Sequence, residues 1–156
     1  MKEYRAVIGM LAGAAGGAVA IGVMEAFSTR AAIPLMAIPF ATSIVLVMGS
    51  PDVEAAQPRA LIGGHIVATI VGLIVVKVAG PAPWAAALAV GLSIMAMHLT
   101  RTFHPPAGID PLLVVVNSMS WSFLLVPVAV GAVLLALFAF IWHLLIRRYS
   151  WPTRWW

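Results

Sequence analysis

The chain has 156 residues, of which 63% are hydrophobic and 9% are charged, and its formal net charge is +4. A soluble domain typically carries about 25% charged residues, so this composition excludes a soluble globular protein and indicates an integral membrane protein. The absence of cysteine excludes disulfides, thiol nucleophiles and thiolate metal sites. The basic residues lie at the ends of apolar segments, where membrane topology explains them, and they do not indicate nucleic-acid binding.

Six apolar segments follow one another along the chain, and a helix that spans a bilayer needs about 20 residues. In chain order the predicted segments are 7–27, 33–48, 60–78, 84–99, 105–119 and 121–147. The second and fifth segments are short and contain prolines, so each is a candidate half-helix or re-entrant segment. We therefore expect an all-α integral membrane protein with a single transmembrane domain, residues 1–156.

The distribution of Lys and Arg predicts which side of the membrane each loop faces. If all six segments cross and the N-terminus is cytoplasmic, the residues inside are Lys2, Arg5, Arg59, Arg101, Arg147, Arg148 and Arg154. Arg30 and Lys77 then lie outside, which is seven against two. Four crossings give six against three, and five crossings give no bias. We expect an even number of crossings, with both termini on the cytoplasmic side of a bacterial inner membrane.

Two stretches around the short segments resemble each other. The sequence "STRAAIPLMAIPFATSIVLV" (28–47) aligns with "LTRTFHPPAGIDPLLVVV" (99–116), which superposes the two Thr-Arg dipeptides and places Pro34 on Pro105. Arginine is rare in this chain, so the shared dipeptide favours a duplication. The alternative is chance, because apolar sequences use few residue types and align easily.

A duplication would give each half three segments, which are long, short and long. Because three is an odd number of crossings, the two halves, approximately 1–79 and 80–150, would have inverted topology. Inverted repeats are an architecture of transporters and channels, and short proline-interrupted segments at matching places indicate the transport site. A half-helix brings unpaired N–H groups to membrane depth, where they can bind an anion.

The residues around these short segments favour anion binding. Proline is well suited to the first turn of a helix, so Pro34, Pro105 and Pro106 are expected to open the short helices. Arginine offers a planar fork of donors to an oxyanion, and histidine adds a donor that can carry a proton. The predicted substrate-binding residues are Thr29, Arg30, Thr100, Arg101, His104, Pro105, Pro106 and Gly108. The alternative is that the two arginines are interfacial residues that extend to lipid headgroups.

A second group of residues is predicted to act in proton transfer or gating. These residues are Asp110, His65, Gln57 and Arg59. Asp110 lies inside the short fifth segment, where it can cap a helix, pair with Arg101 or His104, or accept a proton. The four histidines are scattered and no metal-ligand set or nucleotide-binding motif is present. We therefore expect no metal and no cofactor.

Two motifs in this order, "QPRALIGGH" and "LTRTFHPPAG", resemble the HPP family of small integral membrane proteins. The resemblance extends from about Phe40 to Ile146 and implies four transmembrane segments and a small-anion permease, since family members are linked to nitrite transport. By motif, the positions carried over are Gln57, Pro58, Arg59, Gly63, Gly64, His65, Thr100, Arg101, His104, Pro105, Pro106 and Gly108. Where the family often has Ala-Thr, this chain has Ile109-Asp110, which adds a carboxylate and leaves the identity of the anion open.

These observations predict a transporter or channel for a small inorganic anion, with nitrite as the expected substrate, and not an enzyme. The expected partners are the anion, the lipid bilayer and further copies of the chain, because a chain of this size has little room to enclose a pore alone. One alternative is a structural or assembly subunit. Another is an intramembrane enzyme that uses His104 and Asp110 as an acid–base pair.

Overall fold

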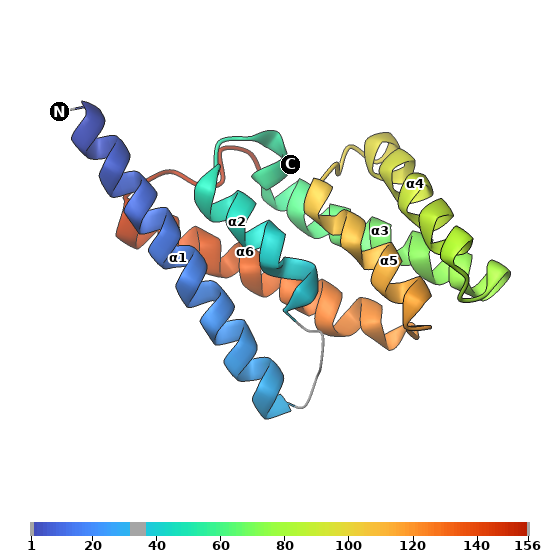
Figure 1. Cartoon of the computed structure of the whole chain (residues 1–156). Helices are drawn as coiled ribbons and strands as arrows, with labels where there is room; N and C mark the ends of the chain where they lie inside the picture. The colour runs from blue at the N-terminus through green and yellow to red at the C-terminus, as the bar shows by residue number, and fades with distance from the viewer. Residues whose placement is uncertain (1, 32–36, 156) are drawn as a thin grey trace.

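The computed structural model describes residues 2–31 and 37–155, and within these ranges it is helical and contains no strand (Figure 1). Its α-helices are α1 (Lys2–Ala31), α2 (Ala41–Gly49), α3 (Pro58–Ala79), α4 (Pro83–Leu99), α5 (Ile109–Val116) and α6 (Val130–Trp142). Short 3₁₀ turns precede α2, α3 and α5, and they are η1 (Ile38–Phe40), η2 (Glu54–Ala56) and η3 (Pro105–Gly108). Wider π-type turns flank α6, and they are η4 (Leu124–Ala129) and η5 (His143–Arg147). The predicted all-α class is confirmed.

Three of the helical segments are long and apolar enough to cross a membrane. They are Ala6–Arg30, Pro58–Ala79 and Leu124–Arg147. The others are apolar but shorter, at 10–17 residues, and they are Ile38–Gly49, Pro83–Leu99 and Pro105–Val116. The expectation that the second and fifth segments are short is therefore confirmed, and the protein is an integral membrane protein by the length and apolarity of its helices.

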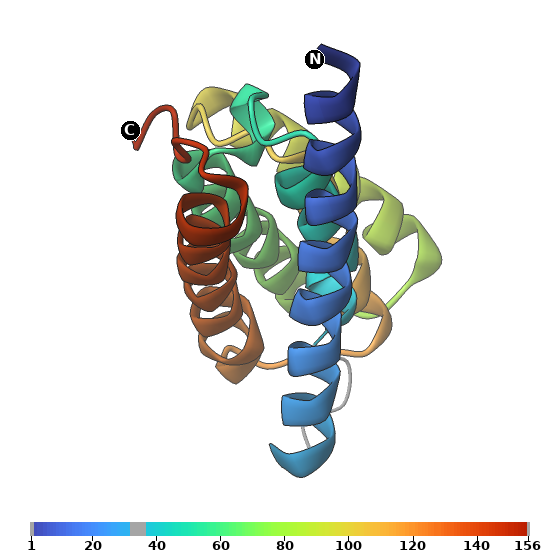
Figure 2. The same ribbon diagram turned by 90° about the vertical axis from the view of Figure 1, so that its left-hand side faces the viewer.

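Helix α3 occupies the middle of the bundle and packs against α4, α5 and α6. Helix α1 packs against α2 and α6 at the outer edge, and its C-terminal end projects beyond the other helices (Figures 1 and 2). Each helix runs opposite to the one before it. Both termini and the connections α2–α3 and α4–α5 therefore lie at one end of the bundle, while the connections α3–α4 and α5–α6 lie at the other.

The two halves of the chain show a similar order of elements. The short segment of each half begins with a 3₁₀ turn that contains proline and continues as a short α-helix. Pro105 and Pro106 open η3 as predicted, because proline lacks an amide hydrogen that a first turn would leave unpaired. Pro34 lies outside the described residues. The duplication and the division into 1–79 and 80–150 stay predictions.

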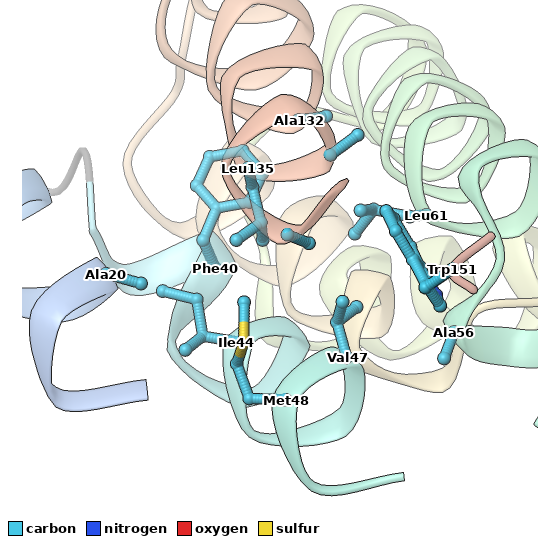
Figure 3. Close-up of a cluster of buried hydrophobic side chains, with 12 residues drawn as sticks. Ala20, Phe40, Ile44, Val47, Met48, Ala56, Leu61, Ala132, Leu135 and Trp151 are labelled. Carbon is cyan, nitrogen blue, oxygen red and sulfur yellow. The ribbon is translucent and has the colours of Figure 1, made fainter. Parts of the chain in front are cut away.

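A buried apolar cluster joins α2 to α1, α3, α6 and the C-terminal segment (Figure 3). Phe40 and Ile44 are almost completely buried in it, and they lie on either side of Ser43 in the sequence. The Phe40 ring packs so closely on α6 that a Cβ atom at Gly131 would lie 2.5 Å from it. This packing fixes the rotation of α2, and with it the direction in which α2 presents its polar residue.

The sixth segment differs from the single helix expected over 121–147. The helix begins at Leu124, and its first turns contain Val126 with φ −132° and ψ 119°, which is extended rather than helical. Pro127 follows directly. Proline restricts the residue before it to extended conformations and cannot donate a helical hydrogen bond, which explains the interruption.

Candidate functional site

The two sequence motifs meet in space where α3 begins and the α4–α5 connection crosses it. Pro58 is the first residue of α3, and Arg59 Nη2 donates to the Thr100 carbonyl oxygen at 3.1 Å. Further along α3, a Cβ atom at Gly64 would lie 2.6 Å from His104 Cβ and 2.8 Å from the Thr102 carbonyl oxygen. Only glycine lets the connection approach the helix this closely, so Gly64 is required for the contact between the motifs.

Below this crossing, a line of hydrogen bonds runs through the interior. His104 Nδ1 donates to the Ala55 carbonyl oxygen at 2.6 Å, and His104 Nε2 lies 2.9 Å from Ser43 Oγ. Ser43 Oγ also lies 2.8 Å from His65 Nε2. The side chains of Ser43, His65 and His104 have no solvent-exposed surface in the monomer. One serine from α2 thus bridges one histidine from each motif.

Asp110 ends this line of hydrogen bonds. Its Oδ2 lies 2.7 Å from His65 Nδ1 and accepts a hydrogen bond from Thr69 Oγ1 at 3.2 Å. Asp110 is completely buried, and its Oδ1 has no hydrogen-bond partner in the described part of the chain. Of the roles open to Asp110, pairing with Arg101 or His104 gives way to pairing with His65, because α5 packs against α3 and the carboxyl group faces His65.

A basic pocket lies on the surface near the same crossing. This arginine pocket has a volume of about 200 Å³ and is lined by Glu54, Gln57, Arg59, Ala60, Arg101 and Arg154. It adjoins a second hollow of about 380 Å³, here called the aromatic pocket, which is lined by Glu54, Ala55, Ala60, His98, Arg101 and Phe103. The two pockets share Arg101, and Ala55, whose carbonyl accepts from His104, belongs to the wall of the aromatic pocket.

Backbone geometry directs Arg101 into these pockets. Thr100 caps the C-terminal end of α4, and its Oγ1 donates to the Ala96 carbonyl oxygen at 2.8 Å. Arg101 follows with φ 56°, in the left-handed region that non-glycine residues rarely adopt. Such backbone strain often accompanies a functional site. The Arg101 side chain is exposed, whereas His104, three residues later, is buried.

Gln57 connects the loop beneath the arginine pocket to the C-terminal segment. Its Nε2 donates to the Pro51 carbonyl oxygen at 2.8 Å, and its Oε1 accepts from the Thr153 backbone N–H at 2.9 Å. Arg154 is therefore held at the rim of the pocket. Gln57 shapes the site through these bonds.

Other predicted residues lie elsewhere. Pro105, Pro106 and Gly108 form η3 and are partly accessible, at the level where the α4–α5 connection enters the bundle. Thr29 and Arg30 lie at the C-terminal end of α1, the end of the bundle opposite to the α4–α5 connection (Figure 2). The structure does not join them to Arg101 in one site, and inverted halves would separate them in this way.

Two residues of the buried line were not predicted, Ser43 and Thr69. Each is a small polar residue within an apolar helix, and polar side chains at such positions often have a functional or interhelical role. Their spacing gave no indication that they converge, because they lie on different helices. Among residues 2–31 and 37–155, no group of three His, Asp or Glu side chains is placed to bind a metal ion.

Comparison with known proteins supports the family resemblance that the two motifs indicate. A family model described as "HPP, transmembrane region" matches residues 2–152. Two proteins of Dictyostelium discoideum, both named only as transmembrane proteins, are 39% and 38% identical over 125 residues, which is 75% of this chain. The chain spans 40% and 44% of their lengths, less than half of each. No solved structure is significantly similar to the chain.

Proposed function

Since the chain belongs to the HPP transmembrane family, we propose that it is a transporter or channel for a small inorganic anion, with nitrite as the substrate. The arginine pocket is the observation that carries this proposal. Three arginines and one glutamate line it, so its net charge favours an anion. Two of these arginines, Arg59 and Arg101, come from the two motifs that meet there.

The chemistry of the pocket suits a small oxyanion. A guanidinium group offers two parallel N–H donors that match two oxygens of a planar anion, and such charge-assisted hydrogen bonds are about twice as strong as neutral ones. Glu54 keeps the site from binding an anion too tightly to release it.

The pockets lie at the end of the bundle that carries both termini, and most Lys and Arg residues of the sequence cluster at that end. By the positive-inside rule this end faces the cytoplasm, so the arginine pocket is the cytoplasmic vestibule of the anion path.

The host membrane is a bacterial inner membrane, and several copies of the chain form a homo-oligomer. Mass measurement of the protein in lipid nanodiscs tests the oligomeric state.

Nitrite uptake into proteoliposomes tests the proposal. Vesicles with the protein should take up nitrite faster than protein-free vesicles made from the same lipids. Excess formate, a planar carboxylate of similar size, should compete, whereas the cation choline should not. If uptake equals that of protein-free vesicles for nitrite and for similar anions, the proposed function is wrong.

One observation favours a second function. Ser43, His65 and Asp110 lie in the order of a serine hydrolase triad, at 2.8 and 2.7 Å. Two features weigh against it: the Ser43 side chain has no exposed surface, and its hydroxyl is engaged with two histidines. We therefore propose that the protein is not an enzyme. A fluorophosphonate probe should leave Ser43 unlabelled, and labelling of Ser43 would establish the hydrolase instead.

A further inference from the structure

The buried line of hydrogen bonds fixes how many protons it holds. It contains four contacts in series: Ala55 oxygen to His104 Nδ1, His104 Nε2 to Ser43 Oγ, Ser43 Oγ to His65 Nε2, and His65 Nδ1 to Asp110 Oδ2. Each contact lies between 2.6 and 2.9 Å, so each needs one hydrogen between its two heavy atoms. Four contacts therefore require four protons.

Ordinary ionisation would supply only three of them. Two neutral histidines bring one ring proton each, the serine brings one, and an ionised aspartate brings none. The fourth proton must be an extra one, and it makes the cluster electrically neutral. A neutral cluster is expected at this buried position, because an uncompensated charge inside a protein is costly in free energy. Thr69 does not change the count, since its hydroxyl donates to Asp110 as an additional bond.

The four protons can be arranged in two ways. The Ala55 carbonyl only accepts, so His104 Nδ1 always carries a proton. In the first arrangement Ser43 donates to His104, His65 Nε2 donates to Ser43, and the extra proton lies between His65 Nδ1 and Asp110. In the second, His104 carries both ring protons and donates to Ser43, Ser43 donates to His65 Nε2, and His65 Nδ1 donates to the Asp110 carboxylate.

One concerted shift converts the first arrangement into the second. A proton passes from Asp110 to His65 Nδ1, one passes from His65 Nε2 to Ser43 Oγ, and one passes from Ser43 Oγ to His104 Nε2. No atom is lost or gained. The net result moves one positive charge from the Asp110 end to His104, whose Nδ1 is bonded to the wall of the aromatic pocket.

We propose that Ser43, His65, His104 and Asp110 form a proton relay that stores one proton and couples its movement to the anion. The coupling rests on the proposed anion transport, whereas the stored proton does not. An anion in the adjoining pockets attracts the positive charge and favours the arrangement with the charged His104. For proton and anion to move together without net charge, one proton must then leave His104 with the anion and one must reach Asp110, whose Oδ1 has no hydrogen-bond partner in the described part of the chain. The charged or titratable groups that line the pockets at the outer end of the relay are Glu54, Arg59, His98, Arg101 and Arg154.

The stored proton is tested without any substrate by nitrogen-15 NMR of histidine in the full chain in lipid. In both four-proton arrangements at least one of the two Nε2 atoms, of His65 or His104, carries a hydrogen. In a three-proton cluster that keeps the bond from His65 Nδ1 to the Asp110 carboxylate, neither does. Substitution His98→Gln helps to assign the signals, since His98 is exposed and outside the relay. Bare Nε2 atoms on both residues would overturn the stored proton.

Coupling is tested by following nitrite uptake and internal pH in the same proteoliposomes, with protein-free vesicles subtracted. Asp110→Asn keeps a donor towards His65 Nδ1 but cannot release a proton, and Ser43→Ala breaks the middle link. Both should reduce nitrite-dependent acidification about 100-fold, the lower end of what a positioned proton-transfer group contributes. Ser93→Ala is the matched control, because Ser93 is equally buried but bonds only the Val90 carbonyl oxygen of its own helix.

The outcomes separate the two proposals. Uptake with acidification that both variants suppress supports transport and relay together. Uptake without acidification, or acidification that survives in both variants, overturns the relay and leaves anion transport standing. No uptake by the unsubstituted protein overturns the proposed function and the coupling with it, and the NMR measurement then decides the stored proton alone.

Discussion

His65 Nδ1 lies 2.7 Å from Asp110 Oδ2, and neither side chain has any solvent-exposed surface. The two residues come from different halves of the chain, 45 positions apart, and the pair joins α3 to α5. Through Ser43 it also connects to His104 of the His-Pro-Pro motif. The chemistry proposed for this protein therefore depends on the same contacts that hold its short helices in place.

Loss of one partner of this pair should be costly. His65→Ala leaves the Asp110 carboxyl group buried without its main partner, and we expect it to lower the free energy of unfolding by about 3–5 kcal/mol. Asp110→Asn retains an N–H donor for His65 Nδ1 and should unfold close to the unsubstituted protein. Thermal unfolding in detergent measures both. Equal stability of the two variants would contradict the geometry of the pair.

The contact between the two motifs requires glycine at position 64. In Gly64→Ala the new Cβ would lie 2.6 Å from His104 Cβ, so the α4–α5 connection must shift, at a cost of about 1–3 kcal/mol. Nitrite uptake should fall with it. Gly91→Ala is the control, since a Cβ there meets no atom within 4 Å, and its uptake should be unchanged. Unchanged uptake in both variants would show that the motifs need not touch.

Cysteine accessibility can test the arrangement of the connections, because the chain has no native cysteine. Val53→Cys in the α2–α3 connection and Ser150→Cys after η5 should react with a membrane-impermeant maleimide from the same side. Ser120→Cys, in the α5–α6 connection, should react only from the opposite side. All three residues are exposed. Labelling of all three cysteines from one side would contradict the alternating direction of the helices.

Gln57 should control the position of the C-terminal segment. Gln57→Leu removes hydrogen bonds to Pro51 and Thr153, each worth about 1 kcal/mol, and should expose the bond after Arg154 to faster cleavage by trypsin. Asn117→Ala is the matched control, because Asn117 makes a similar side-chain bond, to the Leu113 carbonyl oxygen, at the other end of the bundle. Equal cleavage rates in both variants would remove Gln57 from this role.

The sequence predicts the helical elements of this protein better than it predicts the site. Apolar length identifies the long helices, and the proline pair at positions 105 and 106 correctly predicts the start of η3. The interruption at Val126 lies inside the predicted segment 121–147, because apolar length alone does not register a break that Pro127 marks.

The sequence could not predict the hydrogen-bond partner of Asp110, and the reason differs from that for the interruption at Val126. His65 and Asp110 meet only because α5 packs on α3, where Gly72 allows Pro111 to approach so closely that a Cβ at Gly72 would lie 2.7 Å from Pro111 Cα. Ser43 was missed for the same reason, since its role depends on how Phe40 fixes the rotation of α2. Convergence of residues from separate helices is a property of packing and leaves no spacing pattern in the sequence.

The most direct test of the account compares nitrite uptake by Arg101→Gln and Arg148→Gln proteoliposomes. Both arginines are exposed and both have a left-handed φ, 56° and 50°, but only Arg101 lines the arginine pocket. Loss of a charge-assisted hydrogen bond of about 1.5–3 kcal/mol should weaken the apparent affinity for nitrite about 10- to 100-fold in Arg101→Gln. Arg148→Gln should match the unsubstituted protein. Equal affinity in the two variants would contradict the assignment of the arginine pocket as the anion site.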